Sequence, residues 1–218
     1  LLGLADLVRI DHFRAFVDYW EVPAGSPTAA VGRWGLGPGA AFFHRVEAAL
    51  GGLPIVAEDL GALHPEVPAL LKETGLPGMK VMQFAYDGDP ENPFLPEFHI
   101  ENCVVYTGTH DNDTTVGWYR SLRPERRRVV RAALGSAGRG IAWDLIRVAW
   151  ASPAFLAVAP LQDVLELGPE GRMNRPGTFG GNWTWRLRTG ALTPARQEKL
   201  AAANRGAGRS LPTGAGGP

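Results

Sequence analysis

Short runs of apolar residues alternate along this chain with segments in which apolar positions recur at helical spacing. The uninterrupted runs are typical of buried strands, and the spaced segments are typical of helices with one buried face. Strands are expected at residues 7–11, 54–58, 79–84, 103–107 and 155–159. Helices are expected at residues 40–50, from 64 to about 75, at 123–134 and at 143–150.

Glycine and proline separate these segments and end the expected helices. A Gly- and Pro-rich loop is expected over residues 22–39, Gly51 ends the first helix and Gly75 ends the second. The tail after about Arg205 consists mainly of Gly, Ala, Ser and Pro. Residues 206–218 are therefore expected to be disordered.

The alternation of strands with helices favours parallel strands and the α/β class. A closed (β/α)8 barrel has eight strands and about 250 residues. Residues 1–205 are therefore expected to form roughly the second half of such a barrel, about five strands, with the N-terminal strands missing. The chain starts without Met or a secretion signal, so we expect a piece of a longer polypeptide. An opened barrel exposes strand edges, and the isolated chain is expected to be inactive and poorly stable.

Composition narrows the possible partners and the cellular location. Of the 218 residues, 45% are hydrophobic, and 22 basic residues balance 22 acidic ones, so neither a nucleic acid nor a membrane is expected as a partner. Four Arg residues between 126 and 131 are expected to form a solvated helix face. The single Cys103 is expected in the core, and the absence of an internal disulfide favours a cytoplasmic location. The spacing of His, Cys and acidic residues fits neither zinc nor calcium, so no metal and no cofactor are expected.

Three of the apolar runs are followed by a carboxylate, at Asp11, Glu58 and Asp111. A carboxylate inside a buried strand is costly, so it belongs at the strand end, where it can face a cleft. The active site of a parallel barrel lies at the C-terminal ends of its strands. Each residue alone could cap a helix or bind a loop amide, whereas three on different strands favour one site.

Two carboxyl groups that flank a bond are the usual machinery for cleaving a glycosidic linkage with retention. One must be ionised to act as the nucleophile, which suits Asp11 because Arg9 lies on the same strand face. The other must carry a proton, which suits Glu58 because it follows an apolar run and precedes Asp59. The third, Asp111, could bind sugar hydroxyls and help to distort the ring.

Several strings resemble those of one family. Residues 9–16 begin Arg-Ile-Asp-His-Phe-Arg, residues 57–61 are Ala-Glu-Asp-Leu-Gly, and residues 108–114 are Gly-Thr-His-Asp-Asn-Asp-Thr. These strings, with those at 75–81 and 181–186, resemble the amylomaltases, which are 4-α-glucanotransferases also called disproportionating enzymes. The resemblance extends from residue 4 to about residue 188. The third string is the most specific, and the Asp-His-Phe-Arg string separates this family from ordinary α-amylases.

The resemblance implies a role for each of the three carboxylates. Asp11 would be the nucleophile, Glu58 the general acid/base and Asp111 the stabiliser of the transition state; Asp113 is the rival to Asp111. A covalent glucosyl-enzyme would form and then react with a second glucan, with retention. The expected partners are α-1,4-glucan donors and acceptors, together with the missing N-terminal part of the same polypeptide. The residues expected to bind substrate are Arg9, His110, Phe84 and Asn182.

Aromatic side chains suit a glucan because a glucose ring stacks on them. Phe84 is expected to end a strand and point toward the cleft, with Tyr86 on the same face. Trp143 and Trp150 are expected in the core.

Other functions share part of this pattern. A hydrolase of the amylase clan, or the transferase part of a debranching enzyme, would carry the same three carboxylates. A non-catalytic glucan-binding barrel would not need them. A barrel enzyme for phosphorylated substrates would need a Gly-rich phosphate loop, and none of the expected form occurs in the sequence.

Overall fold

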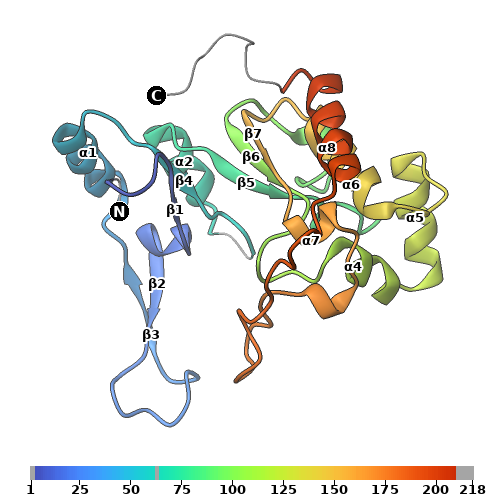
Figure 1. The fold of residues 1–218 in the computed structure, drawn as a ribbon. Helices are drawn as coiled ribbons and strands as arrows, with labels where there is room; N and C mark the ends of the chain where they lie inside the picture. The colour runs from blue at the N-terminus through green and yellow to red at the C-terminus, as the bar shows by residue number, and fades with distance from the viewer. Residues whose placement is uncertain (1–2, 62–63, 210–218) are drawn as a thin grey trace. The chain divides into compact units, whose positions relative to one another are not determined.

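The computed structural model describes residues 3–61 and 64–209 (Figure 1). The chain divides into two compact units. Unit 1 comprises Leu1–Met79 and Asn102–Val104, and unit 2 comprises Lys80–Glu101 and Val105–Pro218.

Unit 1 is built on two parallel strands, β1 (Val8–Ile10) and β4 (Ile55–Ala57). Their register pairs Val8 with Ile55 and Ile10 with Ala57. The helices α1 (Gly39–Leu50) and α2 (Val67–Thr74) contribute residues to the same hydrophobic core. The centre of that core contains Phe13, Phe43, Ile55, Ala57, Val67, Leu70 and Leu76.

Part of the segment expected as a loop, residues 22–39, belongs to a β-hairpin. The 3-10 helix η1 (Phe13–Phe16) leads into β2 (Asp18–Glu21), which pairs antiparallel with β3 (Arg33–Leu36). Trp20 faces Trp34 across the pair with ring centroids 5.3 Å apart, and Arg33 forms an ion pair with Glu21. Such cross-strand pairs stabilise a sheet but join distant positions, so the Gly- and Pro-rich sequence between them did not reveal the hairpin.

A third sheet has the strand order β5 (Gly78–Val81), β6 (Cys103–Tyr106), β7 (Leu156–Val158). The boundary between the units falls within β5 and β6. Phe155 donates to the carbonyl of Glu101, and Thr107 donates to that of Val158. The two bonds advance in the same direction along both strands, so β6 and β7 are parallel. Cys103, Val104 and Val105 are buried, as expected of a core strand.

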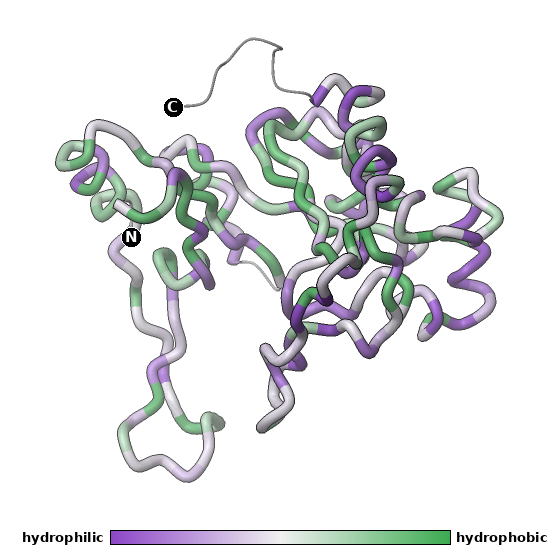
Figure 2. Tube along the Cα trace, viewed as in Figure 1, coloured by the Kyte–Doolittle hydropathy of each residue, from purple (hydrophilic) through white to green (hydrophobic). Residues whose placement is uncertain are grey.

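Helices follow these strands in unit 2. They are α3 (Met82–Ala85), α4 (Thr115–Ser121), α5 (Pro124–Leu134), α6 (Ile141–Ala151), α7 (Leu161–Val164) and α8 (Pro194–Gly206), with the 3-10 helices η2 (Pro96–Phe98) and η3 (Pro169–Gly171). Figure 2 shows hydrophobic residues along β6 and β7 and mainly hydrophilic residues on α5. Within the described part of the chain, no helix is both long and apolar enough to cross a membrane.

Most of the expected elements are confirmed. Each of the five expected strand segments contains a strand, and the four expected helices correspond to α1, α2, α5 and α6. Gly75 ends α2 in the left-handed conformation that glycine tolerates. Trp143 and Trp150 are buried in α6, as predicted. The α/β class with parallel strands and helices therefore stands.

Three further expectations about local structure were wrong in whole or in part. The strand expected at 79–84 ends at Val81, because the backbone turns into the short helix α3 without a Gly or Pro to signal it. The solvated Arg face on α5 is partly engaged, since Arg126 and Arg127 donate to the carbonyls of Asp87 and Leu122. The third error concerns the C-terminal tail.

The tail was expected to begin its disorder at residue 206, yet the fold continues through residue 209. Helix α8 was missed because it has no buried residue and so no apolar stripe. Thr193 caps its first turn by accepting from the N–H of Arg196. Beyond the helix, Arg209 donates to the carbonyls of Trp150, Ser152 and Ala154. The rest of the expected tail, residues 210–218, lies outside the described residues.

Candidate active site

Asp11 follows β1 in unit 1 and is held by Arg9 from the same strand. The guanidinium Nη2 of Arg9 lies 2.9 Å from Oδ1 of Asp11. The side chain of Asp11 is 78% exposed and that of Arg9 is 29% exposed. The Nε of Arg9 also donates to the sulfur of Met79 at 3.3 Å, which fixes the guanidinium over the strand end. The carboxylate is therefore open to a reactant while a cation orients it.

Glu58 follows β4, the parallel neighbour of β1, and its carboxylate binds two backbone amides. Oε2 accepts from the N–H of His12 at 2.7 Å, and Oε1 accepts from that of Leu60 at 2.9 Å. The backbone of Glu58 also bonds with the turn after β1, donating to Ile10 and accepting from Phe13. The structure thus brings Glu58 to the turn that carries Asp11.

The turn after β1 contains a residue with a strained backbone, His12. Its backbone lies in the left-handed region, at φ 51° and ψ 52°. For a non-glycine residue this conformation costs about 1–3 kcal/mol and persists only where the surroundings enforce it. The two bonds from Glu58 to the N–H groups of His12 and Phe13 supply that constraint. His12 therefore has a structural part at the site.

Asp59 is turned toward β5 rather than serving as a charged neighbour of Glu58. Its Oδ1 accepts from the N–H of Met79 at 2.6 Å. Gly78 is needed beside it, because a Cβ there would lie 2.5 Å from Oδ2 of Asp59. The carboxylate of Asp59 thus ties the end of β4 to the start of β5.

Asp111 lies in unit 2, on the loop that follows β6. Its Oδ1 accepts from Nδ2 of Asn174 at 2.6 Å and lies 3.4 Å from Nε2 of His110. Arg172 donates to the backbone carbonyl of Asp111 at 2.6 Å. The ring of His110 packs against that of Trp183, with centroids 5.1 Å apart. His110 and Asp111 are therefore adjacent and share a wall built from the segment after α7.

Hydrogen bonds between its own residues stabilise the loop around Asp111. The Oδ1 of Asn112 accepts from both the N–H and the hydroxyl of Thr109, each at 2.8 Å. Asp113, the rival to Asp111, accepts from the N–H of Thr114 at 2.8 Å. A Cβ at Gly117 would lie 2.5 Å from Oδ1 of Asp113, so this carboxylate faces the start of α4. The described contacts of Asp113 are thus those of a residue that supports the helix start.

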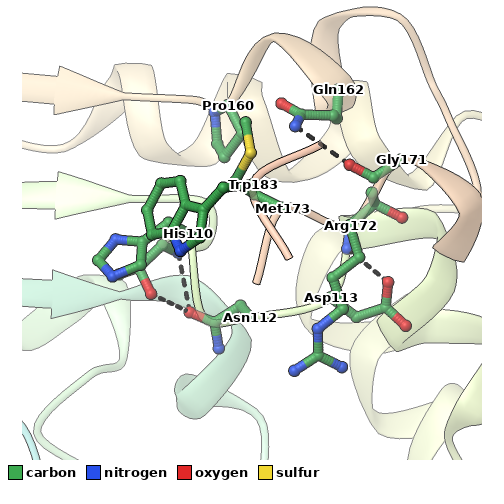
Figure 3. Close-up of a pocket in the computed structure, with 11 residues that line it drawn as sticks. His110, Asn112, Asp113, Pro160, Gln162, Gly171, Arg172, Met173 and Trp183 are labelled. Atoms are coloured by element: carbon green, nitrogen blue, oxygen red, sulfur yellow. Dashed lines mark hydrogen bonds between the residues drawn. The ribbon is translucent and has the colours of Figure 1, made fainter. Parts of the chain in front are cut away.

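A cavity of about 170 Å³ opens beside this loop (Figure 3). His110 and Asp113 line it from the loop after β6, and Gln162, Arg172 and Trp183 line it from the later part of the chain. The Nε2 of Gln162 is fixed because it donates to the carbonyl of Gly171 at 3.1 Å (Figure 3). An aromatic ring beside a few fixed polar groups is a surface suited to a sugar.

Phe84 is partly exposed, as a contact for sugar requires, but its surroundings differ from the expected ones. It lies in α3, is 40% exposed, and packs edge-on against Phe94 at 5.4 Å between centroids. Tyr86, expected on the same face, is only 2% exposed. The switch from strand to helix rotates the two side chains apart. Burial raises the pKa of the Tyr86 phenol far above its ordinary value.

Asn182 closes a turn within its own loop. Its Oδ1 accepts from the N–H of Arg175 at 2.9 Å, and its Nδ2 donates to the hydroxyl of Thr178 at 3.1 Å. It also lines a shallow hollow together with Trp185. No described contact joins Asn182 to Asp111, but its neighbour Trp183 packs on His110.

Sequence reasoning missed three polar residues of this site. Arg172 and Asn174 bind Asp111 from 61 and 63 positions away. Asp163 is 1% exposed and accepts three hydrogen bonds around the base of the same loop. Its burial raises the pKa of its carboxyl group. An Asp inside the apolar run Pro-Leu-Gln-Asp-Val-Leu after a strand was the signal that could have marked it.

Known proteins are similar to most of this chain. A family model described as glycoside hydrolase 77, 4-α-glucanotransferase, matches residues 1–193. A 4-α-glucanotransferase of Thermus thermophilus is 50% identical over 209 residues, covering 92% of this chain and 42% of that protein. One of Synechocystis sp. is 55% identical over 188 residues, covering 85% of this chain and 37% of that protein.

A solved structure agrees with the sequence relatives. The amylomaltase of Streptococcus agalactiae in complex with acarbose superposes with a TM-score of 0.92 at 35% identity, covering 96% of this chain and 43% of that one. The fold is that of an α/β protein with parallel strands and helices. The chain belongs to the glycoside hydrolase 77 family of 4-α-glucanotransferases. It spans about two fifths of the length of these curated relatives.

Proposed function

We propose that this chain carries the catalytic carboxylates of a 4-α-glucanotransferase, which moves α-1,4-glucan segments between maltodextrins. The observation that supports the proposal is the turn after β1, which carries the Arg9–Asp11 ion pair and whose His12 N–H donates to the carboxylate of Glu58, the residue that follows the neighbouring parallel strand β4. Residues 1–205 would supply roughly the second half of a (β/α)8 barrel. The N-terminal part of the same polypeptide would supply the rest.

In the first step Asp11 attacks the anomeric carbon of the donor while Glu58 gives its proton to the leaving glycosidic oxygen. The bond to the leaving glucan breaks, and a covalent glucosyl-Asp11 ester forms. Exposure of Asp11 leaves room for this attack, and Arg9 keeps the carboxylate oriented. The released glucan fragment then dissociates from the acceptor side of the site.

In the second step a hydroxyl group of another glucan gives its proton to Glu58 and attacks the ester carbon. The ester bond breaks, an α-1,4 bond forms, and the anomeric configuration is retained. Transfer prevails over hydrolysis only where the acceptor outcompetes water, which depends on acceptor contacts and on loops that exclude water. The carboxylates alone do not decide that ratio.

Asp111 would stabilise the oxocarbenium-like transition state through the sugar hydroxyls. Its bonds to Asn174 and Arg172 support this role, because they fix both its carboxylate and its backbone. Arg9 and His110 would contact the sugar next to the cleaved bond. Phe84 and Asn182 would contribute to glucan binding at greater distance. A cytoplasmic location, favoured by the single cysteine, stays a prediction.

The test uses the full-length polypeptide that contains these residues, incubated with maltotriose. Transfer predicts glucose together with maltodextrins both longer and shorter than the donor, with no net gain of reducing ends. A net gain of reducing ends would instead favour a hydrolase of the amylase clan. Binding of glucan without any product would favour the non-catalytic barrel. The variant Asp11→Asn should abolish product formation, whereas Glu73→Gln, an exposed residue of α2, should leave it unchanged.

A further inference from the structure

Asp163 is a buried carboxylate that the proposed reaction does not use. It lies in α7, in unit 2, and is 1% exposed. Its Oδ2 accepts from the hydroxyls of Thr107 and Thr115, and its Oδ1 accepts from the N–H of Thr115, all at 2.7 Å. Three donors thus converge on one carboxylate. A carboxylate that is removed from water needs hydrogen-bond donors, because burying an unpaired charge costs much free energy.

The partners of Asp163 lie at the two ends of one loop. Thr107 directly follows β6, and Thr115 is the first residue of α4. The residues between them, 108–114, carry His110 and Asp111. One carboxylate therefore fixes the point where the loop leaves the strand and the point where it enters the helix.

This clamp, formed by Asp163 with Thr107 and Thr115, belongs to the same part of the chain that holds Asp111 directly. Asp163 comes from the helix after β7, and the segment after that helix supplies Arg172 and Asn174, which bind Asp111. The loop is thus tied at its ends by one residue and in its middle by two others. A shift of its ends would carry Asp111 away from Asn174.

We propose that Asp163 is a positioning residue for Asp111, acting through its bonds to Thr107 and Thr115. The inference rests on the proposed function only in that Asp111 is taken to stabilise the transition state. A displacement of about 1 Å at a catalytic group can cost about 100-fold in rate. Because the loss falls on the transition state, kcat should fall while KM changes little.

The variant Asp163→Asn tests the clamp. The amide that replaces one oxygen cannot accept from the N–H and O–H groups that face it, so at least one bond to Thr107 or Thr115 is lost. In the full-length polypeptide, transfer from maltotriose should show kcat lowered by about 10- to 100-fold and KM within about threefold of wild type.

Asp144→Asn is the matched control for burial. Asp144 is 7% exposed in α6 and is bonded to Ser136 and Arg147. The variant Asp144→Asn should lower thermal stability by about as much as Asp163→Asn does. It should not lower kcat at a temperature where both variants are folded. If the two variants lose kcat equally, Asp163 is merely structural and the proposal fails.

Substitutions of Thr107 provide a second test, which can be used even if Asp163→Asn does not fold. Thr107→Ser keeps the hydroxyl that donates to Asp163, and Thr107→Val removes it at nearly constant shape. Valine should lower kcat by about tenfold or more and serine should largely restore it. Equal kcat for both variants would overturn the proposal.

Hydrogen exchange separates this inference from the proposed function. The backbone amides of residues 108–114 should exchange faster in Asp163→Asn than in Asp144→Asn, whatever the reaction is. Unchanged exchange in that loop would contradict the clamp even if transfer is observed. Failure of the wild-type protein to make any product would instead contradict the proposed function and leave the exchange result to decide on Asp163.

Discussion

Replacing Glu58 by Gln should abolish most transfer activity, and the loss should depend on the leaving group of the donor. A general acid/base contributes about 10²–10⁴-fold, equivalent to about 3–5 kcal/mol of activation free energy. A glycosyl fluoride donor releases fluoride, which needs no proton. The first step with α-maltosyl fluoride should therefore lose much less rate than the same step with maltotriose.

The structure also predicts a separate effect of this variant on stability. The carboxylate accepts from the N–H groups of His12 and Leu60, and the amide of Gln can accept from only one of them. Loss of one such bond costs about 1–2 kcal/mol, and it falls on a turn whose His12 already lies in the left-handed region. The variant should unfold at lower denaturant concentration while keeping its fold.

The assay measures the rate of the first step with each donor in a single turnover of the full-length polypeptide, from release of fluoride or of the leaving sugar, at a temperature where the variant is folded. Glu73→Gln is the control, because Glu73 is exposed on α2 of the same unit and its loss removes the same charge. Equal loss of rate for the fluoride and for maltotriose would refute the assignment of Glu58 as the proton donor. So would wild-type rates with maltotriose in the folded variant.

Other variants test the core, the pH dependence and the hold on Asp111. Phe43→Ala should lower the free energy of unfolding by about 3–5 kcal/mol, because the side chain is fully buried among aromatic rings; a loss below about 1 kcal/mol in urea denaturation would contradict this packing. Burial lowers the pKa of His99 below its usual 6.5, so the folded state binds a proton less readily than the unfolded state. Its contribution to stability should therefore be complete above about pH 6.5 and be lost as the pH falls below that value, and the melting temperature of His99→Gln should depend less steeply on pH there; parallel profiles would refute it. Asn174→Ala removes the amide that binds the Asp111 carboxylate and should lower kcat by about tenfold or more with little change in KM, whereas a purely KM effect would assign it to binding.

The sequence predicted the parts of the fold and site that follow from local burial. Strands such as β1 and β4 are short apolar runs, and the cost of burying a charge places Asp11 and Glu58 just beyond their ends. Helices with an apolar stripe, such as α6, were predicted for the same reason. These inferences need no knowledge of which segments meet.

The features that were missed depend on partners far away in the chain. The β2–β3 hairpin is held by Trp20 and Trp34, which are separated in the sequence by a Gly- and Pro-rich stretch. Asn174 looks like an ordinary loop residue in the sequence, and only the structure shows that it binds Asp111. Helix α8 has no buried residue, so periodicity could not reveal it. Local patterns indicate which residues belong at strand ends, but not which distant side chains hold them there.

The proposed mechanism requires Asp11 to form a covalent bond to the sugar, and trapping that ester is its most direct test. The Glu58→Gln form of the full-length polypeptide should react with α-maltosyl fluoride and accumulate the ester, because the base for the second step is missing. Mass spectrometry should then find one maltosyl group on the peptide that contains Asp11, and none in the doubly substituted Asp11→Asn, Glu58→Gln form. A maltosyl group on another residue, or turnover of the fluoride to a product of inverted anomeric configuration without an adduct, would contradict the account.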